Sequence, residues 1–396
     1  MGSDASNLLW KKAELLTATK GKDLSKKFLL KNEVTGISID SRTLIKGDLF
    51  IALIGDKYNG NDFVEDALKK GASGIITSNR QLAKNKFGLY VENINQAFKR
   101  LAIFSRERFK GKVIAITGSN GKTSTKNILS SILDSFEKTH STFNNNNNLI
   151  GLCLTLSRLK QNYKYCVLEL GMSKKGELKS LSKLSSPNLI IITNVSSSHI
   201  ANFKSEEEIA IEKSNIFCGL TKNGKILLNA DDKWFYFLKT KAFSYSNNIV
   251  SFGKKAESEM RIKEILTTDT GTQIKINNFN LNFKHLPKHY VINIAGVLLV
   301  IKSLNLNLKN ILYKINNFQP TQGRGNSFKI SIKNKEHVKI IDDSYNANPA
   351  SMEAALENIY EIKKIQPKIN VVLVIGDMLE LGKNTKTFHE KLIPII

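Results

Sequence analysis

The sequence has few cysteines and no apolar run long enough to cross a membrane. Its 396 residues include 3 Cys, and Cys153, Cys166 and Cys218 form no CxxC pair. This odd, widely spaced set argues against a disulfide framework and predicts buried thiols in a reducing compartment. The apolar stretch at 291–301 is far shorter than the roughly 20 residues of a membrane-spanning helix. The N-terminus has no secretory signal pattern, so we expect a cytoplasmic protein without a membrane span.

Acidic residues are scarce relative to basic ones. The chain has 35 Asp and Glu against 59 Lys and Arg, a formal net charge of +24. Such a charge raises the question of nucleic acid. The lysines are scattered through every segment, however, and no basic run alternates with aromatic residues. We therefore expect anionic small-molecule substrates and no nucleic-acid partner. A basic protein that acts on nucleic acid is the alternative, and it rests on net charge alone.

The order of apolar and helical segments predicts an α/β protein with three domains, because 396 residues are too many for one ordinary core. In the first domain, residues 1–108, the segment 36–55 predicts two strands around a turn. The segment 62–77 predicts a helix followed by a strand, and a helix over 95–109 leads into the second domain.

The second domain, residues 109–317, alternates strands with helices. Such alternation predicts a mostly parallel sheet. The segment 242–286 is irregular and β-prone, and a helix over 291–304 closes the domain. The apolar runs of strand length lie at 113–117, 165–170, 188–195 and 224–230.

The third domain, residues 318–396, predicts one more α/β unit. A strand precedes the segment "DDSYNANP", which opens a helix over 351–362, and a second strand is expected over 370–377.

The stretch "ITGSNGKTSTKNIL" at 116–129 is a shortened phosphate-binding loop. The Walker A pattern asks for glycine where Ile116 stands, whereas the glycine of this chain is Gly118. A loop that follows an apolar strand and opens a helix presents backbone N–H groups to phosphate. Lys122 is then expected on the β- and γ-phosphates and Thr123 on Mg²⁺. The plain alternative is a tight turn with an incidental lysine. The expected ATP-binding residues are Gly118, Ser119, Asn120, Gly121, Lys122, Thr123 and Ser124.

The loop resembles that of the Mur ligases and their folylpolyglutamate synthase relatives. The segments "DDSYNANPASMEAALE" (342–357) and "VIGDMLELG" (374–382) resemble the branch that adds D-alanyl-D-alanine to UDP-N-acetylmuramoyl-tripeptide. "ISIDSRTLIKGDLFIALIG" (37–55) resembles the uridine-nucleotide domain of that family. The resemblance implies a three-domain architecture with a central P-loop parallel-sheet ATPase domain. It also implies a monomer that uses ATP and Mg²⁺ to join a carboxylate to an amine through an acyl phosphate, in peptidoglycan synthesis.

The resemblance implies roles for residues outside the loop. Glu169 ends one apolar strand and His199 follows another; both correspond to metal ligands, together with Thr123. A strand-end acid suits this role because ligands bind at the carboxyl edge of parallel sheets. Lys213 corresponds to a lysine that carries a CO₂-derived carbamate, although its spacing alone would make it a solvated surface lysine. Asn293 corresponds to an adenine-side asparagine.

The inter-domain connection and the third domain supply the remaining candidates. Arg324 in "QGRGN" corresponds to an arginine that reaches the γ-phosphate, and its flanking glycines predict a hinge. Asp343, Asn346 and Asn348 correspond to residues on the ATP and amino-substrate side of the cleft. Ser41 and Arg42 correspond to contacts with the uridine nucleotide or muramoyl-peptide. The expected catalytic set is Lys122, His199, Lys213, Arg324 and Asp343.

The sequence departs from the family pattern in two places. His289-Tyr290 stands where the family usually reads His-Asn. Family members also continue beyond the equivalent of Ile396. We therefore expect an incomplete C-terminal α/β domain, in which a two-stranded parallel fragment leaves an apolar face poorly covered. A folylpolyglutamate-type ligase, the diamino-acid-adding ligase of the same pathway, and a chain that binds nucleotide without turnover remain alternatives.

Overall fold

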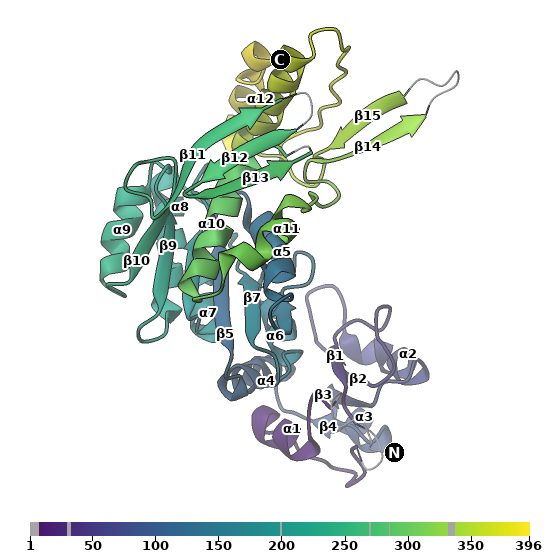
Figure 1. Ribbon diagram of the computed structural model, residues 1–396. Coiled ribbons are helices and arrows are strands. Elements are labelled where there is room, and N and C mark those ends of the chain that lie inside the picture. The colour runs from purple at the N-terminus through teal and green to yellow at the C-terminus, as the bar shows by residue number, and fades with distance from the viewer. Residues whose placement is uncertain (1–7, 30–32, 199, 269–270, 285, 332–336) are drawn as a thin grey trace. The chain divides into compact units, whose positions relative to one another are not determined.

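The computed structural model describes residues 8–29, 33–198, 200–268, 271–284, 286–331 and 337–396 (Figure 1). They form two compact units, one of residues 1–111 with 145–166 and the other of residues 112–144 with 167–396. No helix within the described ranges is both long and apolar enough to cross a membrane.

The first unit is built on a four-stranded parallel sheet in the order β1-β2-β3-β4. Strands β2 and β3 are buried along their whole length, as is typical of mainly apolar strands in a parallel sheet. The strands are β1 (Gly36–Ser38), β2 (Asp48–Ile51), β3 (Gly74–Thr77) and β4 (Leu89–Tyr90). The helices are α1 (Lys12–Thr19), α2 (Val64–Lys69), α3 (Arg80–Asn85), α4 (Ile94–Arg108) and α6 (Leu149–Ser157), with a 3₁₀ turn at Gly60–Phe63.

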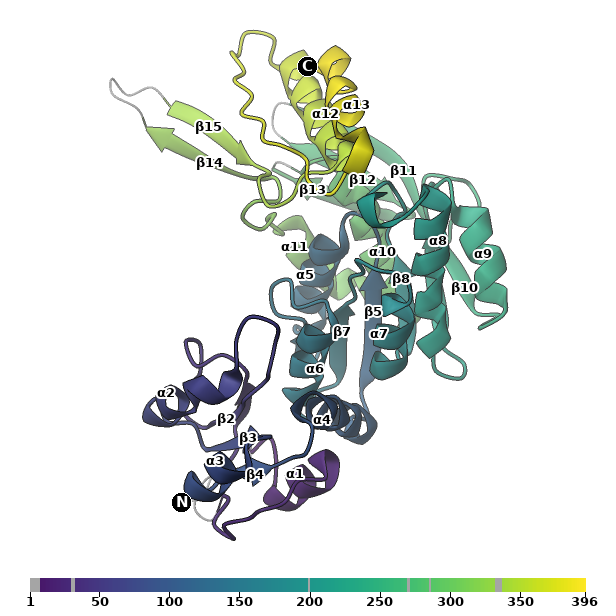
Figure 2. The ribbon, with the colours of Figure 1, turned by 180° about the vertical axis from the view of Figure 1, so that it is seen from behind.

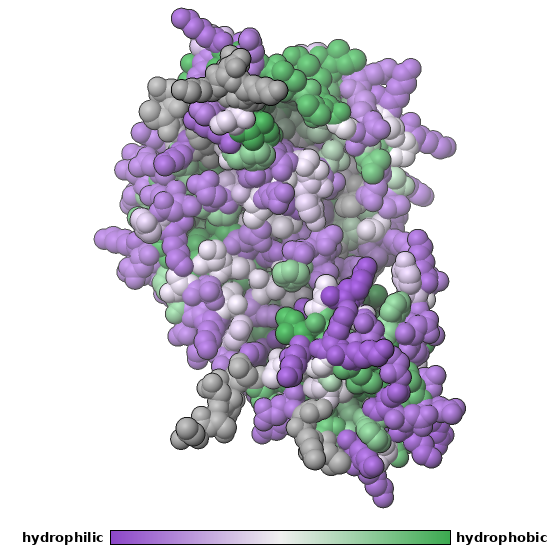
Figure 3. Space-filling view, turned by 90° about the vertical axis from the view of Figure 1, so that its right-hand side faces the viewer, coloured by the Kyte–Doolittle hydropathy of each residue, from purple (hydrophilic) through white to green (hydrophobic). Residues whose placement is uncertain are grey.

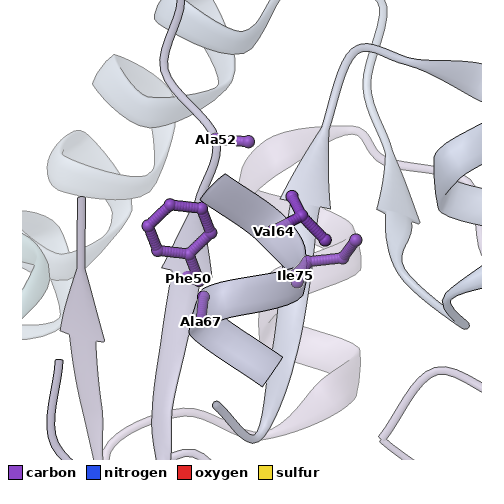
Figure 4. Close-up of a cluster of buried hydrophobic side chains, with 5 residues drawn as sticks. All are labelled: Phe50, Ala52, Val64, Ala67 and Ile75. Atoms are coloured by element: carbon purple, nitrogen blue, oxygen red, sulfur yellow. The ribbon is translucent and has the colours of Figure 1, made fainter. Parts of the chain in front are cut away.

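Helix α2 packs its apolar side onto the sheet of the first unit. Figure 4 shows this cluster of fully buried side chains, Phe50, Ala52, Val64, Ala67 and Ile75. The two strands predicted within 36–55, and the helix and strand predicted within 62–77, are confirmed. The two strands of 36–55 pair in parallel, with Gly36 opposite Asp48.

The second unit contains most of a nine-stranded sheet in the order β13-β12-β11-β10-β9-β8-β5-β7-β6. Strands β5, β8, β9, β10 and β11 pair in parallel, whereas β11, β12 and β13 are antiparallel. The predicted parallel sheet is confirmed there, and the β-prone segment 242–286 adds its antiparallel edge. The strands are β5 (Lys112–Thr117), β6 (Thr139–Ser141), β7 (Tyr165–Glu169), β8 (Leu189–Ile192), β9 (Lys225–Asn229), β10 (Ile249–Gly253), β11 (Met260–Thr267), β12 (Thr272–Ile276) and β13 (Phe279–Phe283).

Helices cover both faces of this sheet. Helix α10 (His289–Ser303) packs on one face beside α5 (Lys122–Leu133), so closely that a side chain at Gly296 would meet Ile191 and Phe252. Figure 2 shows the other face, covered by α7 (Glu177–Ser185), α8 (Glu206–Ser214) and α9 (Phe235–Phe243). Short 3₁₀ turns lie at Ile200–Asn202 and Asn215–Gly219.

The C-terminal segment begins after α11 (Leu312–Asn316), which a 3₁₀ turn at Leu308–Ile311 precedes. Strands β14 (Asn326–Ser331) and β15 (His337–Asp342) form an antiparallel hairpin. Helices α12 (Pro349–Ile365) and α13 (Thr385–Glu390) follow, with 3₁₀ turns at Gly382–Asn384 and Ile393–Ile395. Leu356, Met378, Leu381 and Leu392 form a small core between them.

The predicted strand over 370–377 is wrong, and so is the predicted parallel fragment. Residues 370–377 adopt no strand, and the only ladder of this segment within the described residues is the antiparallel hairpin. Val372 and Val374 are 86% and 96% exposed, and Figure 3 shows apolar side chains gathered at the top of one face. A β-branched run reads as a strand, but a strand forms only where a neighbour accepts its ladder hydrogen bonds.

The thiol prediction holds for two of the three cysteines. Cys153 and Cys166 are buried, and burial raises the pKa of each thiol to about 12. Cys218 is partly exposed, with Sγ 3.2 Å from the Tyr245 hydroxyl, so the prediction that it is buried is wrong. It lies in the 3₁₀ turn after α8, in which Ile216 and Phe217 are the buried residues.

Candidate active site

The glycine loop joins the interior strand β5 to helix α5, as the sequence predicts. Gly118 and Gly121 have φ of +153° and +78°, which L side chains rarely adopt. A Cβ at Gly118 would overlap the Thr193 hydroxyl, and one at Gly121 would lie 2.5 Å from the Asn293 Oδ1. Both positions therefore require glycine, so the loop conformation depends on the shortened glycine spacing.

The start of α5 presents backbone donors. The first helical hydrogen bond is donated by the Thr125 amide to the Gly121 carbonyl at 2.8 Å. The amides of Lys122, Thr123 and Ser124 precede it, so they lie at the positive end of the helix dipole. This arrangement attracts phosphate.

Residues that follow β8 hold the loop in shape. The Ser119 amide donates to the Asn194 carbonyl at 2.9 Å, and the Asn120 amide donates to the Asn194 Oδ1 at 2.9 Å. The Thr193 hydroxyl donates to the Asn120 carbonyl at 2.6 Å. Sequence reasoning missed Thr193 and Asn194, although two polar residues directly after an apolar strand were a usable signal.

Lys122 is folded back onto its own loop. Its Nζ donates to the carbonyls of Gly118 and Ser119 at 2.8 and 3.0 Å. Burial lowers the pKa of Lys122; the Glu169 carboxylate opposes this shift and Arg324 adds to it. The charges of both candidates thus act on the lysine.

Glu169 ends β7 and is 2% exposed. Its amide donates to the Thr142 hydroxyl at 3.0 Å.

A buried cation, Lys126, donates to the carbonyls of Thr142 and Asn144 at 2.7 and 3.3 Å. Burial lowers the pKa of Lys126, and Glu169 opposes that shift. Sequence reasoning missed Lys126, because a lysine one turn into a helix reads as a surface residue.

Lys213 is not a surface residue, contrary to what its spacing suggests. It lies near the end of α8 and is 1% exposed. Burial lowers the pKa of its amine well below the ordinary value, and the positive charge of Lys122 lowers it further. Glu212 and Asp232 oppose the shift. A buried lysine with a lowered pKa is more often the neutral amine, which is its nucleophilic form.

The C-terminal segment meets the loop through two asparagines. The Asn348 Nδ2 donates to the Asn120 Oδ1 at 2.6 Å, and the Asn120 Nδ2 donates back at 3.3 Å. Asn348 also caps α12, because its Oδ1 accepts from the Ser351 amide at 3.0 Å. Pro349 occupies the first turn, as predicted. Asn346 is exposed.

Arg324 lies on the connection that precedes β14. Its guanidinium stands over the Tyr345 ring at 4.1 Å from the centroid. Desolvation raises the pKa of Asp343 to about 6 against the opposing charge of Arg324. The Asn293 side chain lies on α10 beside Gly121, and Asn293 is 4% exposed. The structure thus brings Lys122, Glu169, Arg324 and Asn293 around one loop.

The predicted UDP-substrate residues lie in the first unit. Ser41 is buried, its hydroxyl bonds to Asp66, and its carbonyl accepts from the Lys70 Nζ at 3.0 Å. Arg42 is exposed and binds the Asp40 carboxylate at 2.7 Å. His199, predicted as a metal ligand, lies outside the described residues.

Comparison with known proteins identifies the fold family. Domains described as "Mur ligase family, catalytic domain", "Mur ligase middle domain" and "Mur ligase, glutamate ligase domain" match residues 33–107, 116–301 and 330–396. A UDP-N-acetylmuramoyl-tripeptide–D-alanyl-D-alanine ligase of Rickettsia prowazekii is 36% identical over 366 residues, 91% of this chain and 79% of the relative. The chain belongs to the Mur ligase family. Its membership makes it an ATP-dependent ligase.

Other relatives and solved structures agree with this Mur ligase assignment. The ligase of the same name from Escherichia coli is 32% identical, covering 89% of this chain and 76% of the relative. The crystal structure of MurF from Acinetobacter baumannii matches with a TM-score of 0.83 and 29% identity, over 97% of this chain and 82% of the other. MurF from Thermotoga maritima, in complex with ADP, matches with a TM-score of 0.77 and 27% identity, over 93% and 82%. The expected three-domain α/β Mur ligase architecture is confirmed.

Proposed function

We propose that this Mur ligase joins D-alanyl-D-alanine to UDP-N-acetylmuramoyl-tripeptide with hydrolysis of ATP to ADP and phosphate. The observation that carries the proposal is the similarity, over 91% of the chain, to a relative of that name. The glycine loop supports it, because its amides and lysine suit the phosphates of ATP.

The reaction has two steps. The tripeptide carboxylate attacks the γ-phosphorus and ADP leaves, which gives an acyl phosphate. The amine of the dipeptide then attacks the acyl carbon, and the tetrahedral intermediate expels phosphate as the amine loses a proton. The first step gathers several anions, so cations and preorganised backbone donors supply most of the stabilisation.

Lys122 and Arg324 are the cations we assign to the transferred phosphoryl group. Lys122 leaves the carbonyls of Gly118 and Ser119 when phosphate competes for its ammonium group. Arg324 offers a planar, two-pronged donor from the connection. Asn293, beside Gly121, is assigned to the adenine side, and the loop residues Gly118 to Ser124 to the phosphates.

Thr123 and Glu169 suit a magnesium ion. A hydroxyl at the helix start and a buried carboxylate at a strand end are the hard oxygen donors that Mg²⁺ prefers. Among the described residues, His, Cys, Asp and Glu form no group of three that could hold a metal ion by themselves. Mg²⁺ usually takes only one or two protein carboxylates and completes its shell with phosphate and water. The ion would neutralise charge on the phosphate oxygens; His199 is proposed as a further ligand.

Lys213 is proposed to carry a carbamate. Its neutral amine attacks CO₂, a C–N bond forms and one proton is released, so that a buried cation becomes a buried anion. The lowered pKa of Lys213 favours the amine form that this addition needs. The anion would help to position the metal.

Asp343 and Asn346 are assigned to the amino-substrate side, with Asn348 as the cap that holds their loop against Asn120. Ser41 and Arg42 are assigned to the UDP-substrate. The protein is proposed to act as a cytoplasmic monomer, with domains 1–108, 109–317 and 318–396.

The test is a coupled assay of phosphate release with ATP, Mg²⁺, UDP-N-acetylmuramoyl-tripeptide and D-alanyl-D-alanine. We expect ADP, phosphate and the pentapeptide nucleotide by mass spectrometry. Faster turnover with a diamino acid and the dipeptide nucleotide, or with a folate and glutamate, would reject the proposed substrates. Nucleotide binding without turnover of any substrate would reject the activity.

A further inference from the structure

One buried tyrosine hydroxyl links the nucleotide-binding helix to the connection that carries Arg324. Tyr290, on the first turn of α10, is 1% exposed. Its hydroxyl donates to the backbone carbonyl of Arg324 at 2.7 Å and accepts from the Ser124 hydroxyl at 3.2 Å. Ser124 lies in the first turn of α5, directly after Lys122 and Thr123. Three segments that are far apart in the sequence thus share one hydrogen-bond chain.

The surroundings of Tyr290 keep this hydroxyl in place. Its ring packs against His289 and Phe318, with centroids 4.9 and 5.8 Å away. A side chain at Gly325 would lie 3.2 Å from Pro287 and 3.9 Å from the Tyr290 ring, so the connection approaches closely. Burial raises the pKa of Tyr290, so the hydroxyl stays protonated and donates to the carbonyl.

The Arg324 amide donates to the Thr321 carbonyl at 3.0 Å within the connection, and further hydrogen bonds run toward the C-terminal segment. The Gly323 amide donates to the carboxylate of Asp342 at 3.0 Å, and the Gly325 amide donates to the Asp342 carbonyl at 2.8 Å. The Tyr345 amide donates to the Gly323 carbonyl at 3.0 Å. These bonds join the connection to β15 and the loop after it, whereas the Tyr290 bond joins the Arg324 backbone to helix α10.

We infer that Tyr290 is a positioning residue that holds Arg324 at the nucleotide loop, so that its guanidinium reaches the terminal phosphate of ATP. The inference rests on the proposed function. The hydroxyl of Tyr290 contacts no phosphate in this role; it acts through the Arg324 backbone. An asparagine at position 290 would be too short to span the same three groups, so the link belongs to this chain's own sequence.

The experiment compares the affinities for ADP and for β,γ-methylene-ATP, measured by calorimetry with Mg²⁺. Tyr290→Phe keeps the ring and removes only the hydroxyl. We expect its ADP affinity to stay within about twofold of wild type and its affinity for the ATP analogue to fall about five- to tenfold, as for one lost hydrogen bond. Tyr313→Phe, at a residue 79% exposed on α11, is the matched control and should change neither affinity.

A double-mutant cycle separates positioning from a general structural effect. In the Arg324→Ala background, Tyr290→Phe should cause no further loss of analogue affinity, because the group that it positions is gone. Gly325→Ala, which crowds Pro287, should produce the same selective loss of affinity for the ATP analogue. It replaces Tyr290→Phe in the experiment if that variant does not fold. Equal weakening of ADP and analogue, unchanged analogue affinity, or full additivity with Arg324→Ala would overturn the inference. A wild-type protein that binds neither nucleotide would instead reject the proposed function.

Discussion

At the scale of single residues, the candidate site contains three lysines with a lowered pKa, of which Lys126 and Lys213 are buried and Lys122 is half-buried. Burial lowers the pKa of Lys122, Lys126 and Lys213, while Glu169 offsets the shift for the first two. Burying cations is costly unless they are paired or receive an anionic ligand. In the proposed function ATP supplies such a ligand for Lys122, which would exchange its contacts with the Gly118 and Ser119 carbonyls for phosphate.

Lys122→Ala should lower the rate of phosphate release on the order of 10²–10³-fold, because it removes a preorganised cation from the transferring phosphoryl group. Steady-state kinetics at saturating substrates measures this loss. Lys138→Ala, an exposed lysine of the same unit, is the control and should retain wild-type turnover. Full activity in Lys122→Ala would reject the assignment of the loop.

Lys213→Ala should lose activity by a similar order, about 10²-fold or more, and recover part of it when acetate is added. A small carboxylate can occupy the space of the carbamate and restore the negative charge. The measurement is the phosphate-release rate across a series of acetate concentrations. Ethylamine is the counter-test, since rescue by the amine and none by acetate would indicate a cationic role.

At the scale of elements, the starts of three helices hold many of the residues that we assign to the site. Helix α5 opens at the glycine loop, α10 opens at His289 and Tyr290, and α12 opens at Asn348. Each start places polar side chains at the same region of the second unit, where backbone amides also point. Many candidate residues therefore lie near the beginning of a helix, because the starts of these three helices meet in one region.

Asn348→Ala should lower the free energy of unfolding by roughly 1–2 kcal/mol, since it removes a helix cap and the bond to Asn120. Urea denaturation followed by circular dichroism measures it. Asn346→Ala is the matched variant: this side chain is exposed, so stability should stay within about 0.5 kcal/mol. Equal stability of the two variants would contradict the capping role.

His289 makes stability depend on pH. Burial lowers the pKa of His289 from 6.5 to about 4, so the folded protein favours the neutral ring. The stabilisation is complete above pH 6.5 and is lost as the pH falls toward 4, because the unfolded chain takes up the proton first. The shift corresponds to about 3 kcal/mol at most. The free energy of unfolding, measured at several pH values between 6.5 and 4, should fall less steeply in His289→Leu than in wild type. In the control His337→Gln, at an exposed residue, it should fall as steeply as in wild type.

At the scale of the whole molecule, the connection at residues 321–325 joins the ATPase sheet to the C-terminal segment. Gly323 and Gly325 have φ of +72° and +81°, as a change of chain direction requires. Their amides also donate hydrogen bonds to Asp342, which proline would abolish. Alanine is therefore the cleaner probe of a hinge.

Replacing both Gly323 and Gly325 with alanine should reduce turnover strongly. Each positive φ costs about 1–2 kcal/mol for an L residue, so the connection would no longer adopt the conformation that the proposed hinge needs. Affinity for the UDP-substrate, assigned to the first unit, should stay nearly unchanged. Calorimetric titration with UDP-N-acetylmuramoyl-tripeptide and the turnover assay test the two halves of this expectation. Unchanged turnover in the double variant would exclude the hinge.

Local sequence determined the elements and the loop in this protein. The alternation of apolar runs with helical segments predicted β5, β7, β8, β9 and α10, and the glycine spacing predicted the phosphate loop. Both signals are short-range: they depend on side-chain period and on backbone conformations that only glycine adopts easily. The segment 370–377 shows the limit of such signals: its apolar run predicts a strand, but a strand also needs a neighbouring strand to pair with.

Only the tertiary structure decided which polar residues act together. Lys213 looks like a surface residue on α8 and is buried; Asn348 looks like a ligand-binding residue and caps α12 while it pairs with Asn120. Tyr290 looks like a departure from a motif and proves to link Ser124 to Arg324. Asn348 and Tyr290 find hydrogen-bond partners more than a hundred residues away in the sequence, and no local pattern encodes where those segments meet.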